Sequence, residues 1–175
     1  ARTPGKLSKM LHLASLTSLA IPGIVLGLSY VLFFKGSLIY GSLAILILVN
    51  LVHFFASPYL MIYNTLAKIN EHLEAVGQTL GVSRAKIIRD VIIPQSAATL
   101  GEMFCYFFVN SMMTISAVAF LATASTRPLS LMITSFEAQM MLECAAFIAL
   151  MILAVNLLVR GIFALYKRKI SREAT

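Results

Sequence analysis

Charged residues are scarce in this 175-residue sequence: only 12% are Asp, Glu, Lys or Arg, whereas 59% are hydrophobic. Soluble domains carry roughly 25% charged and about 45–50% apolar residues. The composition therefore excludes an ordinary soluble domain and predicts an integral membrane protein, for which lipid is the main solvent. Because the length allows one domain, we expect residues 1–175 to form a single transmembrane domain.

Acidic residues are the scarcer of the charged ones, with seven against 14 basic residues and a net charge of +7. In a soluble protein such an excess would indicate a nucleic-acid partner. In a membrane protein the same excess follows from the tendency of cytoplasmic loops to collect Lys and Arg. We therefore expect the basic residues to lie beside a lipid membrane and to bind no nucleic acid.

Cysteine and histidine are few as well, with two and three residues. Cys105 and Cys144 fall inside apolar runs and lack the C-x-x-C spacing, which excludes a disulfide framework and a thiolate metal site. The histidines are scattered and form no set of metal ligands. A G-x-x-x-x-G-K-[ST] phosphate loop and a Ser/His/Asp arrangement are also missing. The sequence thus predicts a protein that is not an enzyme and that holds neither a metal nor a cofactor.

Four apolar runs are long enough to cross a bilayer, which takes roughly 20 residues of helix. Such spans must be helices, because backbone N–H and C=O groups find no water in lipid. We therefore predict an all-α integral membrane fold with four transmembrane helices, at about residues 11–34, 38–60, 99–123 and 138–165. The long connection between the second and third spans holds a more polar segment at about 64–96.

The basic residues predict the orientation. With the N-terminus inside, all but Lys35 and Arg127 of the 14 basic residues lie at or near the cytoplasmic face. Both termini and the 64–96 segment are then cytoplasmic, and Arg127-Pro128 marks a turn or broken segment in an outer loop. Since the sequence begins without Met and has no signal peptide, we expect it to be the C-terminal part of a longer protein.

The first span carries a proline and two spaced glycines. Pro22 is expected to kink this helix, and Gly23-x-x-x-Gly27 allows another helix to approach closely. Packing explains these residues better than contact with a solute.

Residues 73–94 read as two short helices joined at a corner. The first has one apolar stripe at helical spacing, formed by Leu73, Val76 and Leu80. Gly81 supplies the left-handed conformation that ends a helix, and Ser83 is a good N-cap for the next one. Pro94 cannot sit inside a regular helix, so it marks where the second helix bends into the third span.

The stretch LGVSRAKIIRDV within this segment also looks like the turn and recognition helix of DNA-binding proteins. Short tethers to two spans would hold it at the bilayer surface, where a duplex docks with difficulty. The alternative interpretation is thus a membrane-anchored regulatory or interaction protein. Such a protein would bind DNA or a protein partner through this helix-turn-helix.

Glu74-Ala75-Val76, Gly81 and Ile92-Ile93-Pro94 together resemble the EAA loop of bacterial ABC-importer permeases of the binding-protein-dependent type. Gly81 and Pro94 match that motif in spacing. Four spans after a basic N-terminal segment match the C-terminal part of a type I permease of this kind, so the resemblance covers nearly the whole chain.

The motif is not matched at every position. Aligned on Gly81, its glutamate falls on Ala75, and its two alanines fall on Val76 and Gly77. The acidic contact of the family therefore comes from Glu74, one place earlier, or is absent.

The resemblance implies a transmembrane permease subunit of the bacterial inner membrane, which forms a solute pathway and hydrolyses nothing itself. It implies a cytoplasmic ABC ATPase dimer and an external solute-binding protein as partners. It also implies a second permease half, which is an identical chain, a different chain or a fused N-terminal half. The residues expected to couple to the ATPase are Glu74, Ala75, Gly77, Gly81, Arg84 and Pro94.

Polar side chains inside the spans are candidates for the solute pathway, because such groups usually face a bundle interior or an aqueous cavity. The candidates are Asn50, Asn110, Ser111 and Thr114. Hydrogen bonding between helices explains them equally well. The stretch NSMMTISAVAFL and the proline of the outer loop look similar to the branch that imports ferric iron or phosphonates such as 2-aminoethylphosphonate. We expect one of these solutes, and a phosphonate rather than iron.

Overall fold

The computed structural model describes residues 5–70 and 72–173, and these form helices joined by turns, with no strand among them. An all-helical fold is thus confirmed. Its longer helices are α1 (Lys6–Leu16), α2 (Gly23–Phe34), α3 (Leu43–His53), α4 (Ala56–Lys68), α7 (Ile93–Met113), α8 (Leu129–Ala138) and α9 (Leu142–Glu173). The short elements are η1 (Thr17–Leu19), α5 (Leu73–Thr79), α6 (Arg84–Ile87) and the π-helical turn η2 (Ile88–Ile92).

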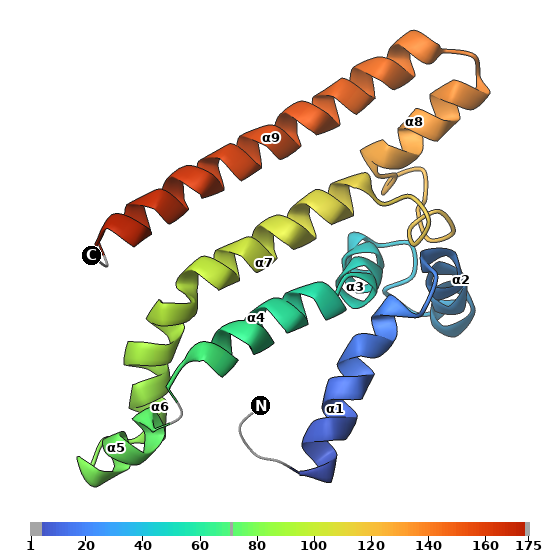
Figure 1. The fold of residues 1–175 in the computed structure, drawn as a ribbon. Coiled ribbons are helices and arrows are strands. Elements are labelled where there is room, and N and C mark those ends of the chain that lie inside the picture. The colour runs from blue at the N-terminus through green and yellow to red at the C-terminus, as the bar shows by residue number, and fades with distance from the viewer. Residues whose placement is uncertain (1–4, 71, 174–175) are drawn as a thin grey trace.

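Three of the longer helices, α4, α7 and α9, run along a common direction. In Figure 1, α4 and α9 lie along α7, the pair α5–α6 forms one end of the molecule, and α2, α3 and α8 gather at the other. Two of the described helical stretches, Arg84–Met113 and Leu142–Arg168, are long and apolar enough to cross a membrane. The count rises to four if each of two bent helix pairs is one span.

The first predicted span, 11–34, is broken rather than kinked. The helices before and after Ala20–Pro22 meet at 105°. Pro22 has no N–H to donate and disfavours helical backbone at the residue before it, so the chain turns there. The helix α2 then restarts at Gly23, with the Pro22 carbonyl accepting its first hydrogen bonds, from Val25 and Leu26.

The second predicted span, 38–60, is also two helices, and it extends further than predicted. The helix α3 ends at His53, α4 runs from Ala56 to Lys68, and the two are bent by 54°. Pro58 explains the break. In a continuous helix its ring would clash with the carbonyl of Phe54, and that carbonyl would receive no hydrogen bond because proline has no backbone N–H. Pro58 instead lies in the first turn of α4, where a backbone N–H would have no partner within the helix, so its absence costs no hydrogen bond.

The third predicted span, 99–123, is helical only to Met113. The chain from Thr114 to Pro128 has no regular helix, although it is as apolar as the helix before it. Irregular backbone is tolerated at membrane depth where protein covers it. Here it is covered, because the core of the molecule consists of Ile45, Leu46 and Val49 from α3, Ala117, Val118 and Leu121 from this segment, and Leu131 from α8.

The fourth predicted span, 138–165, is preceded by a helix that the prediction placed in an outer loop. That helix, α8, follows Pro128 directly and packs beside the start of α9. Met140, with φ of 61°, turns the chain between the two helices. The helix α9 then begins at Leu142 and continues past the predicted end.

Candidate functional site

The helices α5 and α6 form a sharp corner whose centre is Gly81. Gly81 has φ of +69°, in the left-handed region that the sequence predicts for it. The N–H of Val82 donates to the carbonyl of Gly77 at 2.9 Å, which is the six-to-one bond of a Schellman helix end. No atom lies within 4 Å of the point where a side chain at Gly81 would begin, so backbone conformation alone selects glycine here.

Two further residues hold the corner in shape. The Ser83 hydroxyl accepts a hydrogen bond from the N–H of Lys86 at 3.4 Å and so caps α6. Gly77 is buried, and a Cβ atom added to it would collide with the Ile87 side chain, which is only 5% exposed. The small residue at Gly77 therefore allows α5 to lie directly against α6.

The opposite side of the corner is open. Val76 is 53% exposed and Leu80 is 73% exposed, and Ala75 and Arg84 are exposed as well. Glu74 belongs to α5, but its side chain lies outside the described part of the structure. The exposed apolar side chains form a small face on an otherwise polar segment, and such a face is typical of a contact surface.

The corner is continuous with the long helix α7. From Arg84 to Met113 the chain forms one helical stretch of 30 residues, without a loop between α6, η2 and α7 (Figure 1). Pro94 lies in the first turn of α7, directly after the π-helical turn η2. A wider turn of this kind accommodates the missing N–H of a proline without ending the helix. The corner and α7 therefore form one continuous helical unit.

The four candidate pathway residues occupy two places. Asn110 and Ser111 are half-buried near the end of α7, and the Asn110 amide nitrogen donates to the carbonyl of Tyr106 in its own helix at 2.8 Å. Thr114 is buried, and its carbonyl accepts a bond from the Ser130 hydroxyl at 2.7 Å. Among the described residues, no hydrogen bond joins any of these to Asn50 on α3. The buried Oδ1 atom of Asn50 has no partner there.

The sequence did not reveal that the two helix breaks meet. The Ser18 hydroxyl, in η1, accepts from the N–H of Ala56 at the start of α4, at 3.2 Å. A Cβ atom at Gly23 would lie 2.5 Å from the Ser116 hydroxyl and 3.1 Å from the His53 ring. Both breaks and the irregular segment thus converge. The signal in the sequence is the pair Pro22 and Pro58, since each proline interrupts a helix.

An ion pair joins α7 and α9. The Lys167 ammonium group of α9 donates to the Glu102 carboxylate of α7. Both side chains are about half exposed, so the pair contributes at most about 1 kcal/mol. Next to it, Gly101 lets the ring of Phe163 pack directly on α7.

Comparison with known proteins identifies the family of this chain. The chain belongs to the family of binding-protein-dependent transport system inner membrane components, whose family model matches residues 1–172.

Among curated proteins, the chain is 29% identical over 121 residues to the ferric transport system permease protein FbpB of Actinobacillus pleuropneumoniae. The match covers 68% of this chain and 18% of that protein. It is also 28% identical over 121 residues to the putative ferric transport system permease protein FbpB 1 of Haemophilus influenzae, over 68% of this chain and 19% of that protein. The chain therefore spans less than a fifth of the length of these relatives.

Proposed function

We propose that this chain is a transmembrane permease subunit of an ATP-binding-cassette importer in a bacterial inner membrane. In this proposal the solute crosses between its helices and those of a second permease half, and a cytoplasmic ATPase dimer supplies the energy. The observation that carries the proposal is the unbroken helical stretch from Arg84 to Met113, which connects an exposed corner to the interior of the bundle. A component that only anchors a protein to the membrane has no need of such a connection.

The corner is the surface that we assign to the ATPase. Gly77 and Ile87 face each other inside it, and this leaves Val76 and Leu80 on the outside. A short helix with exposed apolar side chains suits a groove on a soluble partner. Ala75 and Arg84 flank this face, and Glu74 is the carboxylate nearest to it in the sequence.

The mechanism that we propose is alternating access by movement of whole helices. Closure of two ATPase subunits would shift the corner, and α7 would move with it because no loop lies between them. Pro94 and η2 would allow the first turns of α7 to change direction. The breaks at Ala20–Pro22 and at Phe54-Phe55 would let the halves of the first two spans move separately, as discontinuous helices do in other transporters.

The proposed orientation puts the corner and both termini in the cytoplasm. Figure 1 shows that α1 begins and α9 ends on the corner's side of the bundle, which supports a common side for all three. The opposite end, with Gly36 and Arg127 in its loops, would then meet the external solute-binding protein.

The sequence favours a phosphonate as the solute, but the relatives do not support that preference, and we favour ferric iron instead. Both relatives named above are described as ferric transport permeases, and neither name mentions a phosphonate. The pathway residues that we propose are Asn110 and Ser111 on α7, Thr114 directly after α7, and Asn50 on α3. Iron uptake into cells that carry the complete transporter, compared with uptake of 2-aminoethylphosphonate, would decide between the two solutes.

Gly81→Val tests the coupling proposal, and Gly36→Val is its matched control. Both glycines have positive φ, +69° and +87°, and neither has an atom within 4 Å of its missing side chain. Each substitution therefore adds about 1–3 kcal/mol of local backbone strain, and in neither case does the new side chain collide with another residue. We expect both variants to reach the membrane in normal amounts, and only Gly81→Val to lose its ATPase on purification. If Gly81→Val retains the ATPase with unchanged ATP turnover, the corner is not the coupling element.

A further inference from the structure

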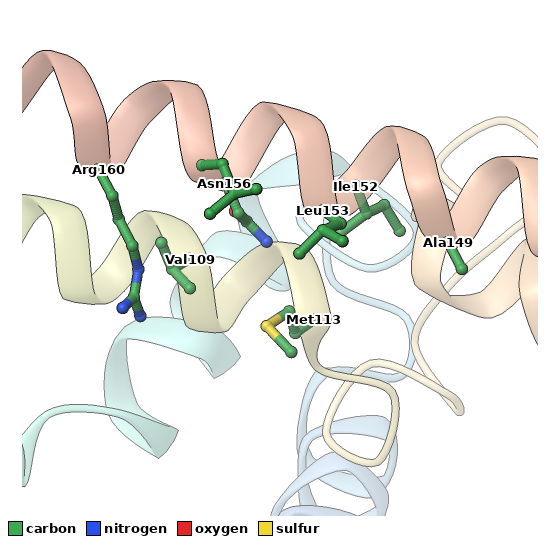
Figure 2. A pocket seen from close by; sticks show the side chains of 8 residues that line it. Val109, Met113, Ala149, Ile152, Leu153, Asn156 and Arg160 are labelled. Atoms are coloured by element: carbon green, nitrogen blue, oxygen red, sulfur yellow. The ribbon is translucent and has the colours of Figure 1, made fainter.

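A cavity of about 300 Å³ opens between α7 and α9 (Figure 2). Its walls are mainly apolar and include Val109 and Met113 from α7 and Ile152 from α9. Two polar side chains, Asn156 and Arg160, also line it, one helical turn apart on α9. A cavity of this composition suits a ligand that is largely apolar and has a polar end.

Asn156 is buried in the wall of this cavity without satisfying its hydrogen-bonding groups. It is only 6% exposed, and its Oδ1 atom has no partner among the described residues. Figure 2 shows its amide nitrogen directed toward Met113 and the space between the two helices. Because a half-turn of the amide exchanges its donor and its acceptor, Asn156 can offer either to a ligand. Buried amides without a partner are uncommon and call for an explanation.

Arg160 has no acidic partner within the described ranges 5–70 and 72–173, whereas Lys167 on the same helix is paired with Glu102. Arg160 also borders a second cavity, of about 240 Å³, together with Glu102, but in the described residues that carboxylate pairs with Lys167 and not with Arg160. Arg160 lies two helical turns, about 10 Å, closer to the middle of α9 than Lys167 does. The Arg160 side chain is exposed at the edge of the cavity. A guanidinium cannot lose its proton, so Arg160 offers a permanent positive charge to an anion at this position.

The surroundings of the cavity point to the source of that anion. Leu153 and Leu157 line the cavity and are 53% and 60% exposed, so its mouth lies on an apolar face of α9. Within a bilayer such a face contacts lipid or the second permease half, and of these two a lipid is the occupant that brings an anion to Arg160. A phosphodiester is the anion that membrane lipids carry, and a guanidinium binds it through two parallel hydrogen bonds.

We propose that the α7–α9 cavity binds one anionic phospholipid. Its phosphate pairs with Arg160, its glycerol ester oxygens accept from the Asn156 amide, and an acyl chain fills the apolar part beside Val109 and Met113. The lipid bridges two helices that are otherwise in direct contact at the corner end, where Gly101 meets Phe163. The site requires that the chain spans a membrane and that this face meets lipid, and it does not depend on the solute or on the ATPase.

Native mass spectrometry of the full chain, purified in detergent and titrated with lipid, tests the site. Phosphatidylglycerol and phosphatidylcholine with identical acyl chains are the two probes. Both lipids carry the phosphodiester, but the choline ammonium of phosphatidylcholine repels the Arg160 guanidinium, so we expect one phosphatidylglycerol to bind about tenfold more tightly. Arg160→Gln should weaken binding of both lipids and remove that preference, because it removes the charge that distinguishes the two headgroups. Arg160→Lys, which keeps the charge, should retain part of it.

Arg168→Gln is the matched control, since it removes the same charge from an exposed position on the same helix, outside the cavity. It should leave the preference unchanged, and excess inorganic phosphate should not displace the lipid. Ala149→Trp should lower binding of both lipids, because it fills the apolar part and leaves Arg160 in place. The proposal is overturned if wild type binds both lipids equally or if Arg160→Gln keeps the wild-type preference for phosphatidylglycerol. It is also overturned if Arg168→Gln loses as much of that preference as Arg160→Gln does. Displacement by phosphate alone would also overturn it.

Discussion

Replacing Gly27 by alanine tests how α2 is held in the bundle. A Cβ atom at Gly27 would lie 2.5 Å from the carbonyl oxygen of Ala117 and 3.2 Å from its carbonyl carbon. Both are backbone atoms of a fully buried residue, so no side chain can rotate away to make room. Forcing an additional methyl group into a packed site costs about 1–3 kcal/mol. Alanine in a helix regains roughly 0.5–1 kcal/mol over glycine, so we expect a net loss on the order of 1–2 kcal/mol.

Gly161→Ala is the matched control for this prediction. Gly161 lies within α9, and nothing is within 4 Å of its missing side chain. The same substitution should therefore stabilise the chain by about 0.5–1 kcal/mol. For a chain of this size 1 kcal/mol corresponds to roughly 2–4 °C in melting temperature. Thermal unfolding of both variants in one detergent should place Gly27→Ala several degrees below Gly161→Ala. Equal melting temperatures would show that α2 does not rest on the irregular segment 114–128.

Three further predictions concern orientation, pathway and the ion pair. A cysteine at Lys35 should react with an impermeant reagent added outside, and one at Arg84 should not; labelling of Arg84→Cys from outside would reverse the orientation. Asn110→Leu should reduce uptake while the complex stays assembled; if the complex dissociates, the residue serves packing and not the pathway. Glu102→Gln should lower stability by at most about 1 kcal/mol, because its pair with Lys167 is partly exposed; a loss several times larger in thermal unfolding would show that the pair is screened from water.

The corner was predictable because its signals are local. A glycine followed two residues later by a capping serine specifies a helix end and a new helix start, whatever surrounds them. Gly81 and Ser83 accordingly have the conformation and the hydrogen bond that the sequence predicts. Gly77 was named for its place in a motif, but its packing against Ile87 became apparent only from the structure.

The helix boundaries were less predictable, because hydropathy measures how apolar a stretch is and not whether it is helical. The stretch from Thr114 to Thr123 is apolar enough for a span, yet it is irregular and is covered by α3 and α8. Which residues would cover it depends on contacts between distant parts of the chain. The same holds for Asn156 and Arg160, whose cavity exists only when α7 and α9 pack together. Pro58, by contrast, was a readable signal for the break at Phe54.

The most direct test of the central claim is photo-crosslinking from the exposed face of the corner. A photoreactive amino acid would replace Val76 in the complete transporter in membranes, and Leu158 would be the control position. Leu158 is apolar and 65% exposed like Val76, which is 53% exposed, but it lies on the spanning helix α9. The account predicts an adduct with the ATPase subunit from position 76 and none from position 158. Equal adducts from both positions, or an adduct from position 76 with nucleic acid in place of the ATPase, would contradict it.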